Sequence, residues 1–147
     1  MSQLPPTPRR DVLRRDDGFT IVELLVTVLI IGILAAIALP LLLTQRQRGQ
    51  DADAKSNARN MVTQLESCYT GTQSYASCDT SQEVVDGGIA LGSAVGQVSL
   101  SVSGSSYTVV AHSFSANHFT VARSSAGPLS YDCTTAGKGA CKGGGRW

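Results

Sequence analysis

An apolar segment of 25 residues, from Phe19 to Leu43, limits what this chain can fold into more than any other feature. Glu23 is its only charged residue. A helix rises ~1.5 Å per residue, so the segment would reach ~37 Å as a helix, enough to cross a hydrocarbon core ~30 Å thick. Arginines flank it on both sides: Arg14, Arg15, Arg46 and Arg48. We therefore expect a single membrane-spanning helix over residues 19–43.

A short charged leader precedes the apolar segment and ends in Asp16-Asp17-Gly18. A secretory signal peptide has its cleavage site after the apolar region, whereas the candidate site here, Gly18-Phe19, lies before it. Glu23 stands five residues into the segment, where an ionised side chain is costly and usually functional. These two features distinguish the segment from an ordinary membrane anchor.

This arrangement resembles the prepilin-type N-terminal segment of type IV pilins and the related pseudopilins. The matching residues are Gly18, Phe19, Thr20, Glu23, Leu24-Leu25-Val26, Gly32, Ala35-Ala36 and Pro40. The resemblance implies that residues 1–18 are a leader, that a prepilin peptidase cuts between Gly18 and Phe19, and that the new amine of Phe19 is methylated. The alternative is an uncleaved signal anchor that contains Gly-Phe by coincidence.

Glu23 is the candidate assembly residue. In lipid a lone carboxylate must take up a proton or find a cation. The resemblance implies that the cation is the N-terminal amine of Phe19 in a neighbouring subunit. That pairing would set the axial register, because a misplaced subunit would leave unpaired charges in an apolar bundle. The alternative is a glutamate that extends to the membrane interface.

Gly32 and Pro40 are the candidate positions of helix flexibility. Proline removes the hydrogen bond to residue 36 and crowds that carbonyl, at a cost of ~3 kcal/mol in a helix interior. The residues alone predict a kink near Pro40. The resemblance implies a segment between the two positions that can unwind in the assembled filament.

After Leu43 the composition becomes polar, yet the helical pattern continues through residues 44–70. Apolar residues recur at spacings of three and four and form one stripe: Ala54, Ala58, Met61, Leu65 and Cys68. We expect one helix from about Phe19 to about Thr70, with an apolar first half and an amphipathic second half. Asp51 and Lys55 form an i,i+4 pair that would stabilise it by tenths of a kcal/mol.

Residues 71–147 are predicted to form a small β-rich head. Residues 71–97 are rich in glycine and are expected to be mostly loop. From Val98 the apolar residues alternate, which predicts antiparallel strands around 98–102, 107–111 and 119–121, with a fourth short strand around Leu129–Asp132. The fold class is therefore α+β, a long N-terminal helix packed on a small antiparallel sheet.

All four cysteines, Cys68, Cys78, Cys133 and Cys141, follow the span. This distribution predicts two disulfides on an exported side, and proximity suggests Cys68–Cys78 and Cys133–Cys141 among three possible connectivities. A zinc site is the alternative, but the spacings are unlike those of CxxC pairs. With the leader arginines, the cysteines favour an N-in, C-out orientation. The tail is expected to be a stapled terminus; its alternative role is surface contact by Lys138, Lys142, Arg146 and Trp147.

No enzyme, cofactor or metal site is predicted. The net charge of +1 gives no electrostatic case for nucleic-acid binding. His112 and His118 could approach each other, but no further ligand accompanies them, and neither a nucleophile elbow nor a phosphate loop occurs.

The predicted function is that of a structural subunit of a type IV pilus-like filament. Its expected partners are copies of itself or other pilins, the prepilin peptidase and the pilus assembly machinery. It would lie in the cytoplasmic membrane before assembly and in an extracellular pilus afterwards. The alternatives are a pseudopilin of a type II secretion or DNA-uptake system, and a signal-anchored binding domain that never polymerises.

Overall fold

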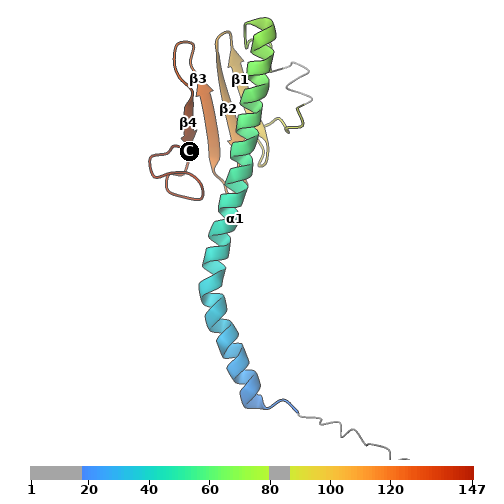
Figure 1. The fold of residues 1–147 in the computed structure, drawn as a ribbon, viewed down its shortest axis with the longest axis vertical. Coiled ribbons are helices and arrows are strands. Elements are labelled where there is room, and N and C mark those ends of the chain that lie inside the picture. Colours follow the sequence, from blue (N-terminus) through green and yellow to red (C-terminus); the bar gives the residue numbers. More distant parts are fainter. Residues whose placement is uncertain (1–17, 80–86) are drawn as a thin grey trace, which may run out of the picture. The chain divides into compact units, whose positions relative to one another are not determined.

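A computed structural model describes residues 18–79 and 87–147 of the chain. The predicted leader up to residue 17 and part of the 71–97 loop lie outside the described residues. The chain divides after Ala38 into an N-terminal unit and a C-terminal unit, which comprises residues 39–147. In the order of the chain, the elements are one helix followed by four strands (Figure 1).

The helix α1 extends over Ile21–Thr72. Its bounds lie two residues C-terminal to the predicted ones at each end, because Thr20 caps the start and the chain leaves the helix at Gln73, whose φ is 56°. α1 continues through both Gly32 and Pro40. α1 is long and apolar enough to cross a membrane, by its length and composition alone.

The strands are β1 (Val98–Ser103), β2 (Ser106–His112), β3 (His118–Arg123) and β4 (Ser130–Cys133). They pair antiparallel in the sequential order β1-β2-β3-β4, which confirms the predicted sheet, its fourth strand included. Each connection is local because consecutive strands are neighbours. Figure 1 shows the sheet beside the C-terminal half of α1.

The core lies between the sheet and the predicted stripe of α1. Every residue of that stripe is buried, and the alternating residues of β2 and β3 face it. The fully buried side chains of this layer include Met61, Leu65, Val109, Phe119 and Val121. The sheet therefore has one apolar face on the helix and one polar face, on which serine, threonine and histidine alternate with the core residues.

Candidate functional site

The start of α1 is fixed by Thr20. The backbone N–H of Glu23 donates a 3.1 Å hydrogen bond to Thr20 Oγ1, and the backbone N–H of Leu24 donates to the Thr20 carbonyl at 3.2 Å. This is the N-cap half of a capping box, and it satisfies one of the unpaired donors of the first turn. The cap uses only the backbone of Glu23. Its carboxylate is exposed and has no hydrogen-bond or ion-pair partner among the described residues.

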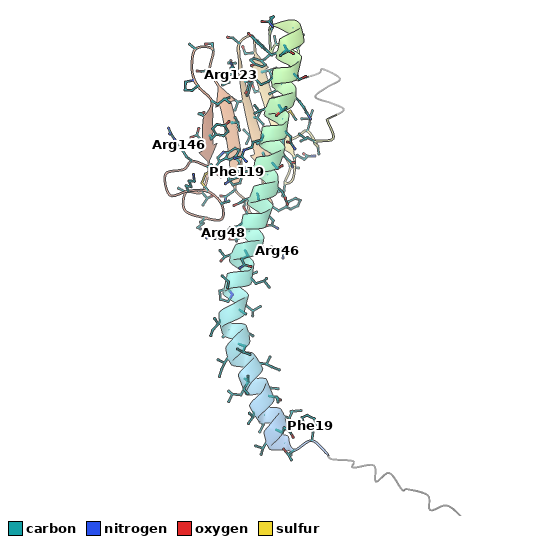
Figure 2. The ribbon with its side chains drawn as sticks, in the orientation of Figure 1. Phe19, Arg46, Arg48, Phe119, Arg123 and Arg146 are labelled. Carbon is teal, nitrogen blue, oxygen red and sulfur yellow. A yellow bond between two sulfur atoms is a disulfide. The ribbon has the colours of Figure 1, made fainter. Side chains whose placement is uncertain are left out.

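The apolar half of α1 is exposed on all sides. Its large apolar side chains from Phe19 to Leu43 have between 47% and 80% of their surface exposed. Figure 2 shows these side chains projecting around the helix, with Phe19 at its start. Such a surface is stable only in lipid or against other apolar helices.

Gly32 and Pro40 both lie within this exposed surface. A Cβ at Gly32 would meet nothing within 4 Å, so the glycine serves no close packing inside this chain. At Pro40 the carbonyl accepts a 3.0 Å hydrogen bond from Thr44 Oγ1. The flexibility predicted for this segment remains a prediction.

In the C-terminal unit, Asp51 is a fully buried carboxylate at the first turn of α1 that meets the sheet. It accepts hydrogen bonds from the β2–β3 loop: from Ser113 at 2.7 Å, from Asn117 at 3.0 Å and from Ser115. The backbone N–H of Ala140 adds a fourth bond at 2.8 Å. Burial raises the pKa of Asp51, but these hydrogen bonds outweigh burial and lower the pKa below its ordinary value.

Asp51 and Lys55 form no ion pair within 4 Å in the described part of the chain, so their predicted interaction is limited to a longer-range attraction. Lys55 instead donates a 2.6 Å hydrogen bond to the carbonyl of Ala140. Burial lowers the pKa of Lys55, Asp51 partly offsets this effect, and nearby Arg59 and Lys142 lower it further. The helix thus contacts the Cys133–Cys141 loop through both charged side chains.

A second carboxylate, Glu66, joins α1 to the other end of the sheet. It forms an ion pair of 2.7 Å with Arg123, and it accepts hydrogen bonds of 3.0 Å from the hydroxyls of Tyr75 and Tyr107. Burial, and then the hydrogen bond and charge of Glu66, raise the pKa of Tyr75 to about 12 and raise that of Tyr107 further.

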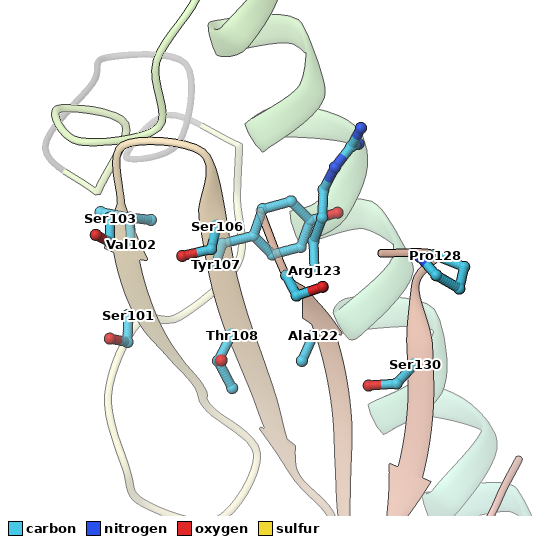
Figure 3. A pocket seen from close by; sticks show the side chains of 11 residues that line it. Ser101, Val102, Ser103, Ser106, Tyr107, Thr108, Ala122, Arg123, Pro128 and Ser130 are labelled. Atoms are coloured by element: carbon cyan, nitrogen blue, oxygen red, sulfur yellow. The ribbon is translucent and has the colours of Figure 1, made fainter. Parts of the chain in front are cut away.

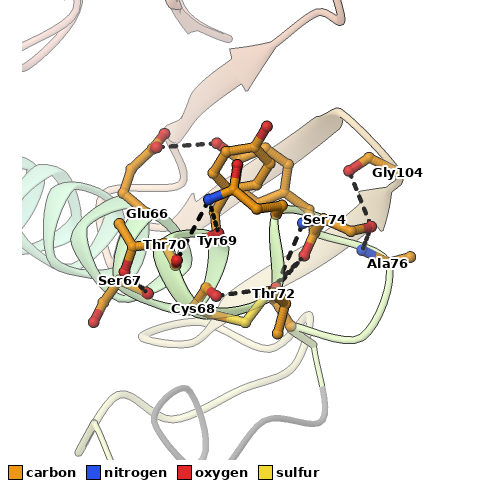
Figure 4. The surroundings of a disulfide bond; sticks show 12 residues. Glu66, Ser67, Cys68, Tyr69, Thr70, Thr72, Ser74, Ala76 and Gly104 are labelled. Carbon is orange, nitrogen blue, oxygen red and sulfur yellow. Dashed lines mark hydrogen bonds between the residues drawn. A yellow bond between two sulfur atoms is a disulfide. The ribbon is translucent and has the colours of Figure 1, made fainter.

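Both predicted disulfides are present. Cys68–Cys78 and Cys133–Cys141 have Cα–Cα distances of 6.0 and 5.8 Å. Figure 4 shows the first of them at the end of α1, where the Thr72 hydroxyl donates hydrogen bonds to the carbonyls of Cys68 and Ser74. The second closes the loop that holds the Ala140 N–H against Asp51.

The polar face of the sheet carries a hollow of about 400 Å³ near the β1–β2 turn (Figure 3). Its lining is mainly hydroxyl side chains, and Arg123, its only charged residue, is already paired with Glu66. At the opposite end of the same face, the Nδ1 atoms of His112 and His118 lie 2.9 Å apart. Among residues 18–79 and 87–147, no group of three or more potential metal ligands occurs.

The fold and the exposed helix place the chain in a class of small α+β proteins whose N-terminal helix is stable only in an apolar environment. Within that class, residues 13–39 match the family described as the prokaryotic N-terminal methylation motif. This motif, together with two relatives that are named as type IV pilin or fimbrial proteins, shows that the chain is similar to type IV pilins over part of its length.

Two relatives are similar to the chain. It is 39% identical over 62 residues to the type IV major pilin protein PilA of Myxococcus xanthus, which covers 42% of this chain and 28% of the relative. It is 33% identical over 93 residues to the type IV major fimbrial protein FimA of Dichelobacter nodosus, and this alignment covers 58% of this chain and 60% of the relative. The chain therefore spans less than two thirds of the length of each. No solved structure matches the chain.

Proposed function

We propose that the chain is a structural subunit of a type IV pilus-like filament. The observation that carries this proposal is the Glu23 carboxylate, which has no partner within residues 18–79 and 87–147 and lies on an apolar helix that is exposed on all sides. Removing that helix from lipid is favourable only if other apolar helices cover it. The two relatives are named as major subunits of type IV structures, which supports the same role.

Processing would prepare the helix for this assembly. Cleavage between Gly18 and Phe19 would place a charged amine one residue before the Thr20 cap, at the end of α1 where the helix dipole is already positive. Methylation keeps this charge. Glu23 of an adjacent subunit would supply the opposite charge, and the pairing would set the axial register as subunits join. We further propose that Gly32 and Pro40 let this segment of α1 unwind in the filament.

Before assembly, the apolar half of α1 would hold the subunit in the cytoplasmic membrane with its N-terminus inside. The two disulfides support an oxidising compartment for the C-terminal unit. The prepilin peptidase and an assembly machine would act on this membrane form. After extrusion, the sheets would form the outer surface of a filament.

The test is the intact mass of the chain in material sheared from whole cells. We expect the mass of Phe19–Trp147 plus one methyl group and minus four hydrogens, which reports processing and both disulfides in one measurement. A polymer with this mass that is retained inside the envelope would favour a pseudopilin. The full-length mass, found only in the membrane fraction, would overturn the filament role and favour an anchored domain.

A further inference from the structure

One end of the C-terminal unit lies nearest to Leu43, the last residue of the apolar segment, which itself belongs to this unit. We define this proximal end as α1 residues 44–53, the β2–β3 loop 113–117 and the loop 134–142. All three parts meet at Asp51, which accepts hydrogen bonds from both loops. The opposite end of the sheet is the β1–β2 turn, whose Gly104 carbonyl accepts a hydrogen bond from Tyr75, just beyond the end of α1.

The proximal end lies close to where a bilayer would end. Arg46 and Arg48 follow Leu43 by three and five residues, and Asp51 follows it by eight. At ~1.5 Å per residue, Asp51 is ~12 Å along the helix from the last apolar residue. The headgroup layer occupies ~5–7 Å on each side of the hydrocarbon core. The two loops at Asp51 would therefore lie within about one Debye length, ~8 Å, of the headgroups.

The exposed charges of the proximal end are predominantly positive. Lys138 and Lys142 flank the segment bound by Asp51, and both are exposed without an ion-pair partner among the described residues. Arg46 and Arg48 are exposed in the same way (Figure 2). The proximal end has only one exposed carboxylate beside these four cations. It belongs to Asp53, since the carboxylate of Asp51 is fully buried.

The same end also exposes apolar side chains. Phe114, in the β2–β3 loop, has 68% of its surface exposed, and Val95, next to the proximal end, has 56%. They are neighbours, because the Phe114 ring lies against Gly96. Ser113 and Ser115, which flank Phe114, both donate hydrogen bonds to Asp51. Asn117 donates to Asp51 and also to the Lys138 carbonyl, so the loops that present Phe114 and Lys138 are fixed to α1. Cations beside an exposed aromatic side chain are typical of surfaces that bind anionic membranes.

We propose that the proximal end is a docking surface for the anionic phospholipids of the membrane in which α1 is anchored. In the unassembled subunit, Lys138, Lys142 and the two arginines would contact lipid phosphates while Phe114 enters the headgroup layer. This docking rests on the membrane insertion proposed above. It would hold the C-terminal unit against the bilayer until the subunit is extracted into a filament.

The test uses the full chain in lipid nanodiscs, with one chain per disc. One set of discs contains phosphatidylcholine alone, the other contains phosphatidylcholine mixed with phosphatidylglycerol, and the lipids of both sets have brominated acyl chains. Trp147 is the only tryptophan of the chain, so Phe114→Trp in a Trp147→Phe background places a single indole at the proximal end. Bromine quenching of this indole is expected to rise with phosphatidylglycerol and to fall at high salt. Replacing Lys138 and Lys142 with glutamine should weaken docking about fivefold for each lysine removed.

Arg59→Gln is the matched control, because it removes one exposed charge that lies ~24 Å along α1 from Leu43 and should leave the quenching unchanged. The unsubstituted chain provides a second measurement: amide exchange at residues 113–117 and 137–142 should slow in the anionic discs. Equal quenching and exchange in both lipids overturns the docking surface. Quenching that depends on a second chain per disc overturns it too, in favour of a contact between copies. A chain that fails to stay in phosphatidylcholine discs instead refutes the membrane step of the proposed function, and the docking with it.

Discussion

The hydroxyl of Ser113 donates a 2.7 Å hydrogen bond to the carboxylate of Asp51, across 62 residues of sequence. With its other donors, this makes Asp51 the buried junction between α1, the β2–β3 loop and the Cys133–Cys141 loop. A Cβ at Gly139, which has a φ of 59°, would lie 2.1 Å from Asp51 Oδ2, so the loop approaches the carboxylate closely only because residue 139 is glycine.

Asp51→Asn is predicted to destabilise the C-terminal unit by roughly 3 kcal/mol, because hydrogen bonds to a charged group are lost and buried donors face an amide N–H₂. The measurement is urea unfolding of the full chain in detergent micelles, followed by near-UV circular dichroism. Asp53→Asn is the matched control: Asp53 is exposed two residues away, and its replacement should change the free energy of unfolding by less than ~0.5 kcal/mol. Equal effects of the two substitutions would contradict the role given to Asp51.

The lowered pKa of Asp51 predicts that the C-terminal unit loses stability at acidic pH. The pKa of Asp51 in the folded chain lies below the ordinary value of 3.8, so the unfolded chain binds a proton at higher pH than the folded chain does. The stabilisation is therefore fully present above pH 3.8 and is lost as the pH falls through the lowered pKa. In Asp51→Asn this part of the pH dependence should disappear, which unfolding curves between neutral and strongly acidic pH would show.

Sequence patterns predicted the apolar core between α1 and the sheet, but they did not predict the hydrogen-bonded contacts of Asp51. The stripe from Ala54 to Cys68 and the alternation of β2 and β3 follow from periodicity, which is a local property. Asp51 lies one turn before the stripe and, in sequence, pairs with Lys55. Its actual partners are two hydroxyls, an amide and a backbone N–H, all more than 60 residues away, and no local sequence pattern predicts such partners. The contacts of Glu66 with Tyr107 and Arg123 are also far apart in sequence, so no local pattern predicts them either.

Glu66→Gln is predicted to lower the pKa of Tyr75, now about 12, and that of Tyr107, although burial keeps both above that of a free tyrosine. The substitution removes a negative charge that opposes formation of either phenolate. Absorbance titration at alkaline pH should show two of the four tyrosines ionising late in the unsubstituted chain and earlier in Glu66→Gln.

The raised tyrosine pKa values also predict an alkaline limit of stability. A tyrosine that stays protonated in the folded chain stabilises it fully below pH ~10, the pKa in the unfolded chain, and this stabilisation is lost as the pH rises through the folded value. The free energy of unfolding should therefore fall between pH 10 and about 12. Glu66→Gln should narrow the pH interval over which the free energy of unfolding falls. An unchanged alkaline transition would contradict the role of Glu66 in raising the pKa values of Tyr75 and Tyr107.

Opening the second disulfide by Cys133→Ser with Cys141→Ser is predicted to cost ~2.5 kcal/mol by the chain-entropy estimate for so short a loop. The cost should exceed that of opening Cys68–Cys78, because the Cys133–Cys141 loop also presents the Ala140 N–H to Asp51. Combining each double substitution with Asp51→Asn tests this coupling. The Cys133–Cys141 effect should shrink in the Asp51→Asn background, whereas the Cys68–Cys78 effect should add independently.

At the start of α1, Glu23 contributes its backbone to the helix cap while its carboxylate takes no part in that cap. Thr20 caps the helix through the backbone N–H of Glu23, so the cap does not need the carboxylate. Thr20→Ala should therefore cost ~1 kcal/mol and speed amide exchange over the first turn, with Thr20→Ser as its conservative control.

Glu23→Gln should leave that exchange unchanged, because glutamine keeps the backbone donor and the side-chain length. It is nevertheless predicted to prevent ordered polymer, since the amide has no charge to offer the amine of a neighbouring Phe19. The yield of sheared filaments, measured beside membrane levels of the subunit, tests the two substitutions together. Normal polymer from Glu23→Gln would assign the residue to the helix start alone, whereas loss of polymer with unaltered exchange would assign its charge to assembly.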